Sequence, residues 1–276
     1  MSDAREFESR GCRLHYKRVG AGEPIVFIQG VGLHGDGWLP QTRSLSAKFE
    51  CVTFDNRGMG RSQPAGAAVT VQQMAEDTLS VMDAAGMRAA HLVGHSLGGV
   101  IALQTAIIAP QRVKSLSLLC TSARGADATQ LSMRMAWLGL RSRVGSRRMR
   151  AQAFLEIVMP REYLAGQDCD ALAEQLKPIF GHDLADTPPI VMRQLGALKR
   201  FDATGRLAEL KRIPTLVMSA AEDVIFPPPC GKALAEGIPG ARFVELDGVA
   251  HGMTIQSAER VNQQLLQHIK SVGAGD

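Results

Sequence analysis

The sequence predicts an α/β fold in which a mostly parallel central sheet is flanked by helices and interrupted by a helical cap. Two observations lead to this prediction. Short apolar runs typical of buried strands alternate with segments of helical spacing along most of the chain. Residues 123–202 break the alternation, because they contain helix formers, several methionines and no convincing buried strand. We therefore expect a core domain of residues 1–122 and 203–276, with residues 123–202 as the helical cap.

Composition narrows the classes of protein to consider. With 276 residues, 45% hydrophobic and 21% charged, the chain is typical of a globular protein with a sizeable core. Its net charge of +4 gives no reason to expect a nucleic-acid partner. The first twenty residues lack an apolar signal segment, and the five cysteines include no Cys-x-x-Cys pair. We expect a cytoplasmic protein without a disulfide framework or metal site, and we make no prediction of its oligomeric state.

The first half of the chain is expected to open with a β-hairpin and then to alternate strands with helices. The segments REFESRG and CRLHYKRVG flank the turn residues Arg10 and Gly11, which predicts a hairpin at one edge of the sheet. The apolar runs that follow predict buried strands at Pro24–Gln29, Cys51–Asp55, Ala89–His95 and Val113–Cys120. Helical spacing predicts helices at Trp38–Phe49, at Thr70–Met87 with Thr70 as N-cap, and at Leu97–Ala109.

The alternation of strands and helices returns after the predicted cap. In chain order we expect a helix at Thr204–Leu210, a strand at Pro214–Ser219, a helix near Lys232–Ala235, a strand at Ala241–Leu246 and a final helix at Ser257–Ile269. No internal repeat or low-complexity linker separates these elements. The two parts of the core therefore belong to one sheet.

One stretch of the chain, Leu92–Pro110, contains no charged residue and has the length of a membrane span. Several glycines, His95 and Ser96 interrupt it where a span needs continuous apolar helix, and it lies between α/β units. We therefore expect no membrane span here. The stretch is better explained as a strand and a helix buried at the centre of the sheet.

At the centre of this stretch is a Gly-x-Ser-x-Gly pentapeptide, Gly94 to Gly98. The bare pattern is weak, because glycine and serine are common in this chain. Its context is more specific, since a buried strand enters the pentapeptide and a long apolar helix leaves it. This strand–turn–helix arrangement is typical of a nucleophile elbow, in which a sharp turn holds a serine above the sheet and the glycines provide backbone clearance. We predict that Ser96 is a catalytic nucleophile.

A serine hydroxyl needs a base to take its proton, and the base is usually a histidine oriented by a carboxylate. In enzymes with such an elbow, the acid and then the histidine follow the serine along the chain. His251 is the only histidine between the last predicted strand and the last predicted helix, whereas His182 and His268 lie within helical segments. The acid should follow the preceding strand, where Glu222 and Asp223 are both candidates.

Five segments together resemble the α/β-hydrolase superfamily, and most closely its lactonase, esterase and cofactor-free haloperoxidase group. They are FIQGVGLHGDGW, FDNRGMGRS, LVGHSLGG, PTLVMSAAEDVIFPP and LDGVAHG, and they span nearly the whole chain in the family's order. The resemblance implies the α/β-hydrolase fold. It also implies Asp223 as the acid, with Ala220 at a position where the family has glycine, and DNRGMGRS as a turn that supports the site.

A hydrolase of this family stabilises the oxyanion of its tetrahedral intermediate with two backbone N–H groups. The residue after the nucleophile, Leu97, is one expected donor. The other comes from the loop after the first core strand, where the family usually has His-Gly-x and x donates. This chain has Gln29, Gly30 and Val31 there, so Val31 is the expected donor and the glutamine is a departure from the family's pattern.

The expected reaction is hydrolysis of a small-molecule carboxylic ester or lactone through an acyl-enzyme. The resemblance implies no organic cofactor and no metal. Three alternatives stay open within the same fold: a cofactor-free perhydrolase or haloperoxidase, a C–C bond hydrolase, and a small-molecule receptor with an intact triad.

Several residues near these motifs have a less specific interpretation. His34, in the loop on the oxyanion side, and Trp137, in the predicted cap, are candidates for the substrate pocket. His95 is expected to point away from the nucleophile and to make a packing or polar contact. The arginine-rich run Arg141–Arg150 is better explained as a solvated helix face than as a site for an acidic partner.

Overall fold

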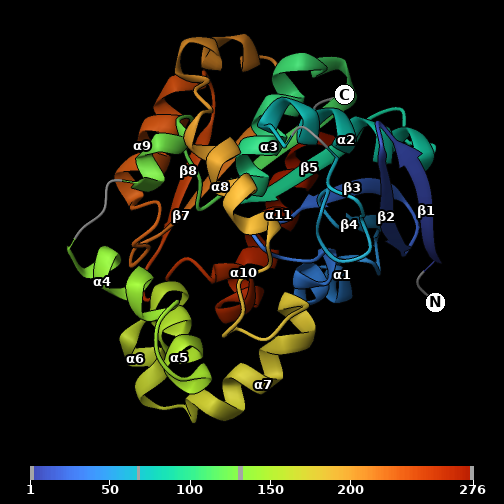
Figure 1. Cartoon of the computed structure of the whole chain (residues 1–276). Coiled ribbons are helices and arrows are strands. Elements are labelled where there is room, and N and C mark those ends of the chain that lie inside the picture. Colours follow the sequence, from blue (N-terminus) through green and yellow to red (C-terminus); the bar gives the residue numbers. More distant parts are fainter. Residues whose placement is uncertain (1–2, 67–68, 130–132, 274–276) are drawn as a thin grey trace.

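The computed structural model describes residues 3–66, 69–129 and 133–273. Within the predicted cap, residues 130–132 lie outside this description. The described strands form one sheet of eight, in the order β1-β2-β4-β3-β5-β6-β7-β8 (Figure 1). Their bounds are β1 Asp3–Ser9, β2 Cys12–Val19, β3 Glu23–Ile28, β4 Phe49–Phe54, β5 Ala90–His95, β6 Val113–Leu119, β7 Thr215–Ala220 and β8 Arg242–Leu246.

The sheet is mostly parallel, as the sequence predicts. The strands from β4 to β8 in this order pair in parallel, whereas β1 pairs with β2 and β2 with β4 in antiparallel. The expected hairpin is therefore present at one edge. Its turn residues Arg10 and Gly11 have φ of 49° and 74°, the left-handed backbone that a two-residue hairpin turn requires.

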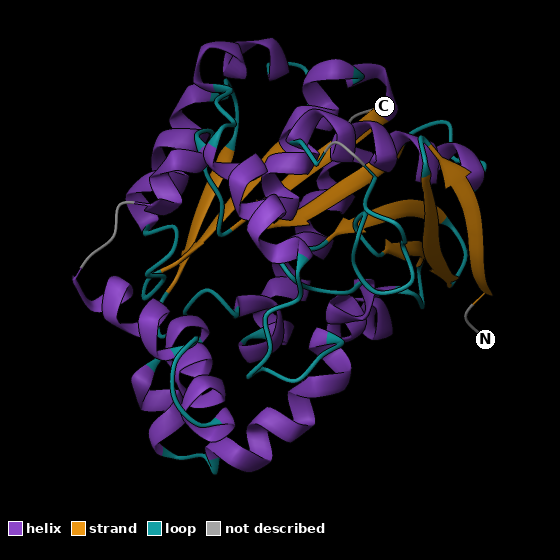
Figure 2. Ribbon diagram, viewed as in Figure 1, coloured by secondary structure: helices purple, strands orange, loops and turns teal. Residues whose placement is uncertain are grey.

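Helices cover both faces of the sheet (Figure 2). Those outside the cap segment are α1 Leu39–Leu45, α2 Val71–Ala84, α3 Leu97–Ile108, α9 Pro228–Gly237, α10 Met253–Gln256 and α11 Ala258–Gly273. The helix predicted at Trp38–Phe49 is too long, because β4 already begins at Phe49 and the segment Gly35–Trp38 is 3-10 helix. The predicted helix at Thr204–Leu210 is also 3-10 rather than α. The predicted N-cap of α2 is correct, since the Thr70 side chain accepts a hydrogen bond from the N–H of Gln73.

Between β6 and β7 the chain forms α4 Met133–Arg141, α5 Arg147–Val158, α6 Arg161–Ala165, α7 Cys169–Phe180 and α8 Ile190–Lys199. We call these five the intervening helices. In Figure 1, α5, α6 and α7 gather on one side of the sheet, away from both marked chain ends. Buried apolar side chains of α4, α5 and α7 form a cluster of their own, which includes Leu138, Leu155 and Leu176.

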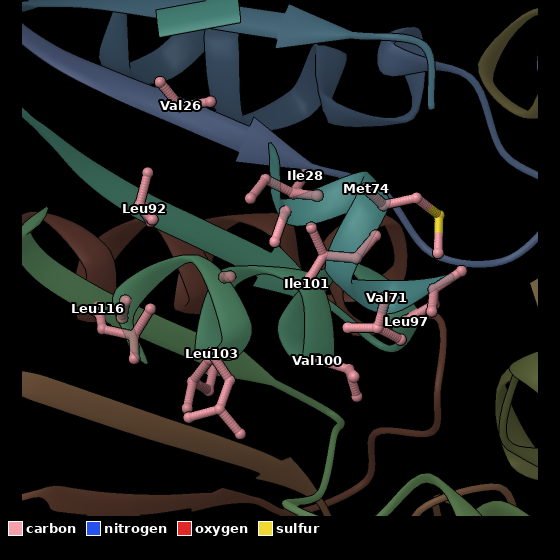
Figure 3. Packing of buried hydrophobic residues seen from close by; sticks show 14 of the residues in the cluster. Val26, Ile28, Val71, Met74, Leu92, Leu97, Val100, Ile101, Leu103 and Leu116 are labelled. Carbon is pink, nitrogen blue, oxygen red and sulfur yellow. The ribbon is translucent and has the colours of Figure 1, made fainter. Parts of the chain in front are cut away.

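Two apolar clusters fill the two faces of the sheet, and the alternation of β3 shows how they divide. Val26 and Ile28 face the cluster under α2 and α3, whereas Ile25 and Phe27 face the cluster under α1 and α11. Figure 3 shows the first cluster, which includes Leu92 of β5 and Ile101 of α3. The uncharged stretch Leu92–Pro110 thus lies in the core, and none of the described helices has both the length and the apolar composition of a membrane span.

The turn DNRGMGRS is anchored by an ion pair inside the protein. The guanidinium of Arg57 binds the carboxylate of Asp77 on α2 through two hydrogen bonds of 2.5 and 2.6 Å, and each side chain is 1% exposed. Neighbouring residues of the turn reach the loop after β3. Asp55 Oδ1 accepts from the N–H of Gly35 at 2.9 Å, and Asn56 Nδ2 donates to the carbonyl of Gln29 at 2.9 Å. The turn therefore supports that loop.

We predict that Asp77→Asn destabilises the protein strongly, because it leaves the buried Arg57 charge without its partner. Removing one member of a buried ion pair costs about 3–5 kcal/mol of unfolding free energy. Urea unfolding followed by circular dichroism measures this loss. Glu209→Gln, which breaks the exposed pair of Arg206 and Glu209, is the matched control and should unfold like the wild type. Equal midpoints for the two variants would contradict the prediction.

Candidate active site

The four predicted site segments lie at the carboxyl ends of four parallel strands of the sheet. Ser96 follows β5 directly, and the loop with Val31 follows β3. Asp223 lies three residues beyond the end of β7, and His251 lies in the loop after β8. Parallel strands end at the same edge of a sheet, and ligand sites of open α/β sheets are found there. Residues far apart in the chain are thereby brought to one edge.

Ser96 occupies a strained turn. Its backbone has φ 56° and ψ −122°, which non-glycine residues adopt rarely, and it is the N-cap of α3. The turn is possible only because its neighbours lack side chains. A Cβ on Gly94 would overlap the backbone of Gly98, and a Cβ on Gly98 would overlap the carbonyl of Ile28. The predicted elbow is therefore present, with its glycines in close backbone contact.

A hydrogen-bonded pair of acid and histidine lies beside the elbow. His251 Nδ1 is 2.7 Å from Asp223 Oδ2, and both residues are buried. The other carboxylate oxygen accepts from the backbone N–H groups of Ile225 and Phe226 at 2.8 and 3.0 Å. Because an ionised carboxylate only accepts, the proton of a neutral His251 is on Nδ1, which leaves Nε2 free to act as a base. Glu222, the other candidate acid, is exposed.

Ser96 and His251 line one cavity of about 520 Å³. Its walls are mostly apolar, and about half of the lining residues come from the intervening helices and the segment between α7 and α8. These side chains include Phe154, Val158, Ile179, Phe180, Leu184, Val191, Met192 and Leu195. The cavity can therefore hold a mostly apolar group in contact with a serine and a histidine.

His95 contacts the loop that carries His251. Its Nε2 lies 2.8 Å from the carbonyl oxygen of His251, to which it donates, and the two ring centroids are 4.8 Å apart. Burial lowers the pKa of His95 to about 3, so the ring is neutral at neutral pH. The polar contact expected for His95 is present, and it fixes the backbone of the loop that carries His251.

The loop after β3 lies against the nucleophile, since a Cβ on Gly30 would come within 3.2 Å of the Ser96 Cβ. Gln29, which stands where the family usually has histidine, accepts a hydrogen bond from the N–H of Gly30 through its own Oε1 at 3.0 Å. Val31, the next residue, lines the cavity. The N–H of Leu97 is the first of α3 and so has no acceptor within that helix. Of the two expected oxyanion donors, Leu97 thus adjoins Ser96 in the chain, and Val31 lines the same cavity as Ser96.

Neither His34 nor Trp137 is among the described residues that line this cavity. The ring of His34 lies against Gly181, at the end of α7. Trp137 is 55% exposed and stacks under the guanidinium of Arg141 at 4.6 Å. Both depend on how the intervening helices pack, which local sequence does not reveal. The same holds for His182 and Gln194, which contact Gly32 in the loop after β3 and which sequence reasoning did not select.

One trio of potential metal ligands comes together among the described residues: His95, Cys120 and His251, with ligand atoms within 4.8 Å of one another. Their bonding argues against a metal site. His251 Nδ1 is bound to Asp223, and His95 Nε2 is bound to a carbonyl. Burial raises the pKa of the Cys120 thiol well above its ordinary value, so the thiolate that a metal needs is disfavoured. We assign no metal to these residues.

Comparisons with known proteins identify the family and the fold of the chain. A family described as the alpha/beta hydrolase fold matches residues 23–258. A protein of Azorhizobium caulinodans, which bears the provisional name of carbamate hydrolase RutD, is 31% identical over 92% of this chain and 93% of its own length. The crystal structure of a hydrolase from Pseudomonas aeruginosa aligns with a TM-score of 0.80 at 25% identity, over 97% of this chain and 98% of that one. The enol-lactonase from Burkholderia xenovorans aligns with the same TM-score at 24% identity, over 96% and 100%.

We predict that Gly98→Ala prevents the elbow from forming, because the added Cβ would overlap backbone atoms that cannot move aside. The variant should show a large loss of thermal stability or of soluble yield. Gly139→Ala in α4 is the matched control. A Cβ there meets no atom within 4 Å, so this variant should be as stable as the wild type. A Gly98→Ala protein that unfolds at the wild-type temperature would contradict the prediction.

Proposed function

Because the chain belongs to the α/β-hydrolase fold family, we propose that it is a serine hydrolase of carboxylic esters or lactones. One observation carries the proposal. His251, whose Nδ1 lies 2.7 Å from Oδ2 of the buried Asp223, lines the same cavity as Ser96 at its sharp strand–helix turn. This combination of residues has the roles needed for nucleophilic acyl transfer.

The proposed reaction proceeds in two steps. His251 Nε2 takes the proton of Ser96 as the hydroxyl attacks the substrate carbonyl, and the N–H groups of Val31 and Leu97 stabilise the resulting oxyanion. His251 then delivers the proton to the leaving alkoxide, which gives the acyl-enzyme. Water activated by the same imidazole attacks the acyl-enzyme and releases the acid product. Asp223 holds the imidazole in the required tautomer throughout.

We also propose that residues 123–202 act as a cap over this site. Two observations support the proposal. The cavity is lined from α5, α7 and α8 as well as from the sheet edge, and helices α4, α5 and α7 share an apolar cluster separate from the two clusters of the sheet. A cap of this kind excludes water from the reacting groups and strengthens electrostatic interactions at the serine.

The cavity supports a substrate with a medium-sized apolar acyl or alkyl part. Its volume is far larger than a bare carbamate ion, and its walls offer mostly apolar contacts. Carbamate hydrolysis is the second candidate, because curated relatives with about 30% identity carry that name. A serine triad can attack either carbonyl, so the size and polarity of the preferred substrate distinguish the two.

We further propose a cytoplasmic location, as the sequence suggested. All five cysteines are free thiols. Free, mostly buried cysteines are usual in a reducing compartment. The proposed partner is the small-molecule substrate alone.

We predict a large loss of ester turnover when any of the proposed catalytic residues is replaced. Ser96→Ala, His251→Ala and Asp223→Asn should each lower the turnover of p-nitrophenyl butyrate by roughly 10⁴-fold, because the three groups act as a unit. Glu222→Gln is the matched control for Asp223→Asn, since it removes the neighbouring but exposed carboxylate, and its turnover should equal that of the wild type. A larger loss in Glu222→Gln, or a fluorophosphonate that labels a residue other than Ser96, would refute the assignment.

We also predict that the protein prefers esters with longer acyl chains. Along p-nitrophenyl acetate, butyrate and hexanoate, kcat/KM should rise, because each buried CH₂ contributes about 0.8 kcal/mol, roughly fourfold. For comparison, the release of ammonia from carbamate is measured with the protein and corrected for the spontaneous breakdown of carbamate. Catalysis of carbamate breakdown by a protein that leaves all three esters intact would favour the second candidate and reject the first.

A further inference from the structure

The loop that carries the proposed second oxyanion donor is held from two sides. On the sheet side, Gln29 Oε1 accepts from the N–H of Gly30, and Asn56 Nδ2 donates to the carbonyl of Gln29. On the other side, Gly32 is bound through both of its backbone polar groups. Its N–H donates to Gln194 Oε1 at 2.9 Å, and its carbonyl lies 3.0 Å from His182 Nε2. The contacts to Gly32 come from residues more than 140 positions away in the chain.

Gln194 and His182 both belong to the cap segment. Gln194 lies on α8 and is completely buried, and His182 lies just after α7. Only the oxygen of the Gln194 amide is used, because Nε2 has no hydrogen-bond partner among the described residues. His182 Nδ1 also lies 2.8 Å from the carbonyl of Asp183. A neutral imidazole donates to one of its two carbonyls, so Gln194 is the firmer of the two contacts.

These contacts determine how the N–H of Val31 is oriented. The hydrogen bond from the Gly30 N–H to Gln29 fixes the plane of the Gln29–Gly30 peptide. The hydrogen bond from the Gly32 N–H to Gln194 fixes the plane of the Val31–Gly32 peptide. The peptide that bears the Val31 N–H is therefore held between two fixed planes. Gly32 has a φ of 74°, and a Cβ there would lie 3.0 Å from Val191 on α8, so the loop is closely packed against the same helix.

We propose that Gln194 is a positioning residue for catalysis, assisted by His182: it orients the Val31 N–H toward the oxyanion and so makes the oxyanion hole depend on the cap. The proposal rests on the proposed function, because it assigns Gln194 a role in acyl transfer at Ser96. An oxyanion donor contributes only if it is aimed at the developing charge, and removing one outright costs about 10²–10³-fold in kcat. A misaligned donor loses part of that contribution.

The test compares Gln194→Leu with Gln194→Glu. The leucine removes the acceptor and leaves the Gly32 N–H unpaired, whereas the glutamate retains an oxygen at the same position. Active sites are first titrated with a fluorophosphonate, so that kcat is expressed per reactive Ser96. With p-nitrophenyl butyrate, Gln194→Leu should lower kcat roughly ten- to a hundredfold while KM changes less than about twofold. Gln194→Glu should recover most of the loss.

A second measurement separates positioning from a merely structural role. A butyl trifluoromethyl ketone forms a tetrahedral adduct with Ser96, and this adduct carries an oxyanion. Butyrate, the product, forms no such adduct. In Gln194→Leu the affinity for the ketone should fall by the same factor as kcat, and the affinity for butyrate should stay unchanged. Ile190→Val is the matched control, because it trims a buried side chain of α8 that has no atom within 4 Å of a Cβ placed on Gly32, and its kcat per site should equal that of the wild type.

The outcomes distinguish this inference from the proposed function. Wild-type protein that neither turns over esters nor reacts with the fluorophosphonate would overturn the proposed function itself. Active wild type together with an unchanged kcat per site in Gln194→Leu would overturn only the role of Gln194. Equal losses in Gln194→Leu and Ile190→Val would do the same, because they would show a general effect of α8 packing.

Discussion

The structure depends on the close backbone packing where β5 turns into α3. Gly94 and Gly98 let the strand and the helix approach so closely that no side chain fits between them, and Ser96 sits at the turn with a positive φ. Such a backbone costs of the order of 1–3 kcal/mol and persists only where its surroundings impose it. Here the surroundings are α3, whose apolar side chains are buried against the sheet, and Leu119, whose carbonyl accepts the N–H of Ser96 at 2.9 Å.

This constraint connects the core with the chemistry. The same turn that raises Ser96 above the sheet also makes Leu97 the first residue of a helix, with its N–H unused, and places His95 under the loop of His251. Packing at the centre of the fold thus holds the strained backbone of Ser96 in place. The apolar stretch that resembles a membrane span by composition is needed for this reason, since only a deeply buried helix can hold the turn.

The sheet, its edge hairpin and its flanking helices follow from the sequence, because a parallel strand buried on both faces is a short apolar run that is easily recognised. The bounds were less accurate. Nothing local distinguishes the end of α1 from the start of β4, and pairing between Phe49 and Glu23 of β3 decides it. The gathering of Ser96, Asp223 and His251 at one edge of the sheet was predictable, because these residues follow strand ends that the topology brings together.

The part of the candidate site that comes from the intervening helices was not predictable in the same way. Helical spacing indicates helices between β6 and β7 but not which of their faces meets the sheet edge. Trp137 looks like a pocket residue in the sequence and is exposed, whereas Gln194 looks like an ordinary helical glutamine and is buried against Gly32. Such contacts depend on the packing of whole helices over the sheet, which is a tertiary property.

The order of the strands also bears on how the chain folds. β6 and β7 are neighbours in the sheet, yet the five intervening helices separate them in the chain. Joining them closes a long loop, and contacts of such high sequence separation form slowly. A nascent chain that ends between β6 and β7 already contains Ser96 but lacks Asp223 and His251. These three residues therefore come together only after the last two strands, β7 and β8, have joined the sheet.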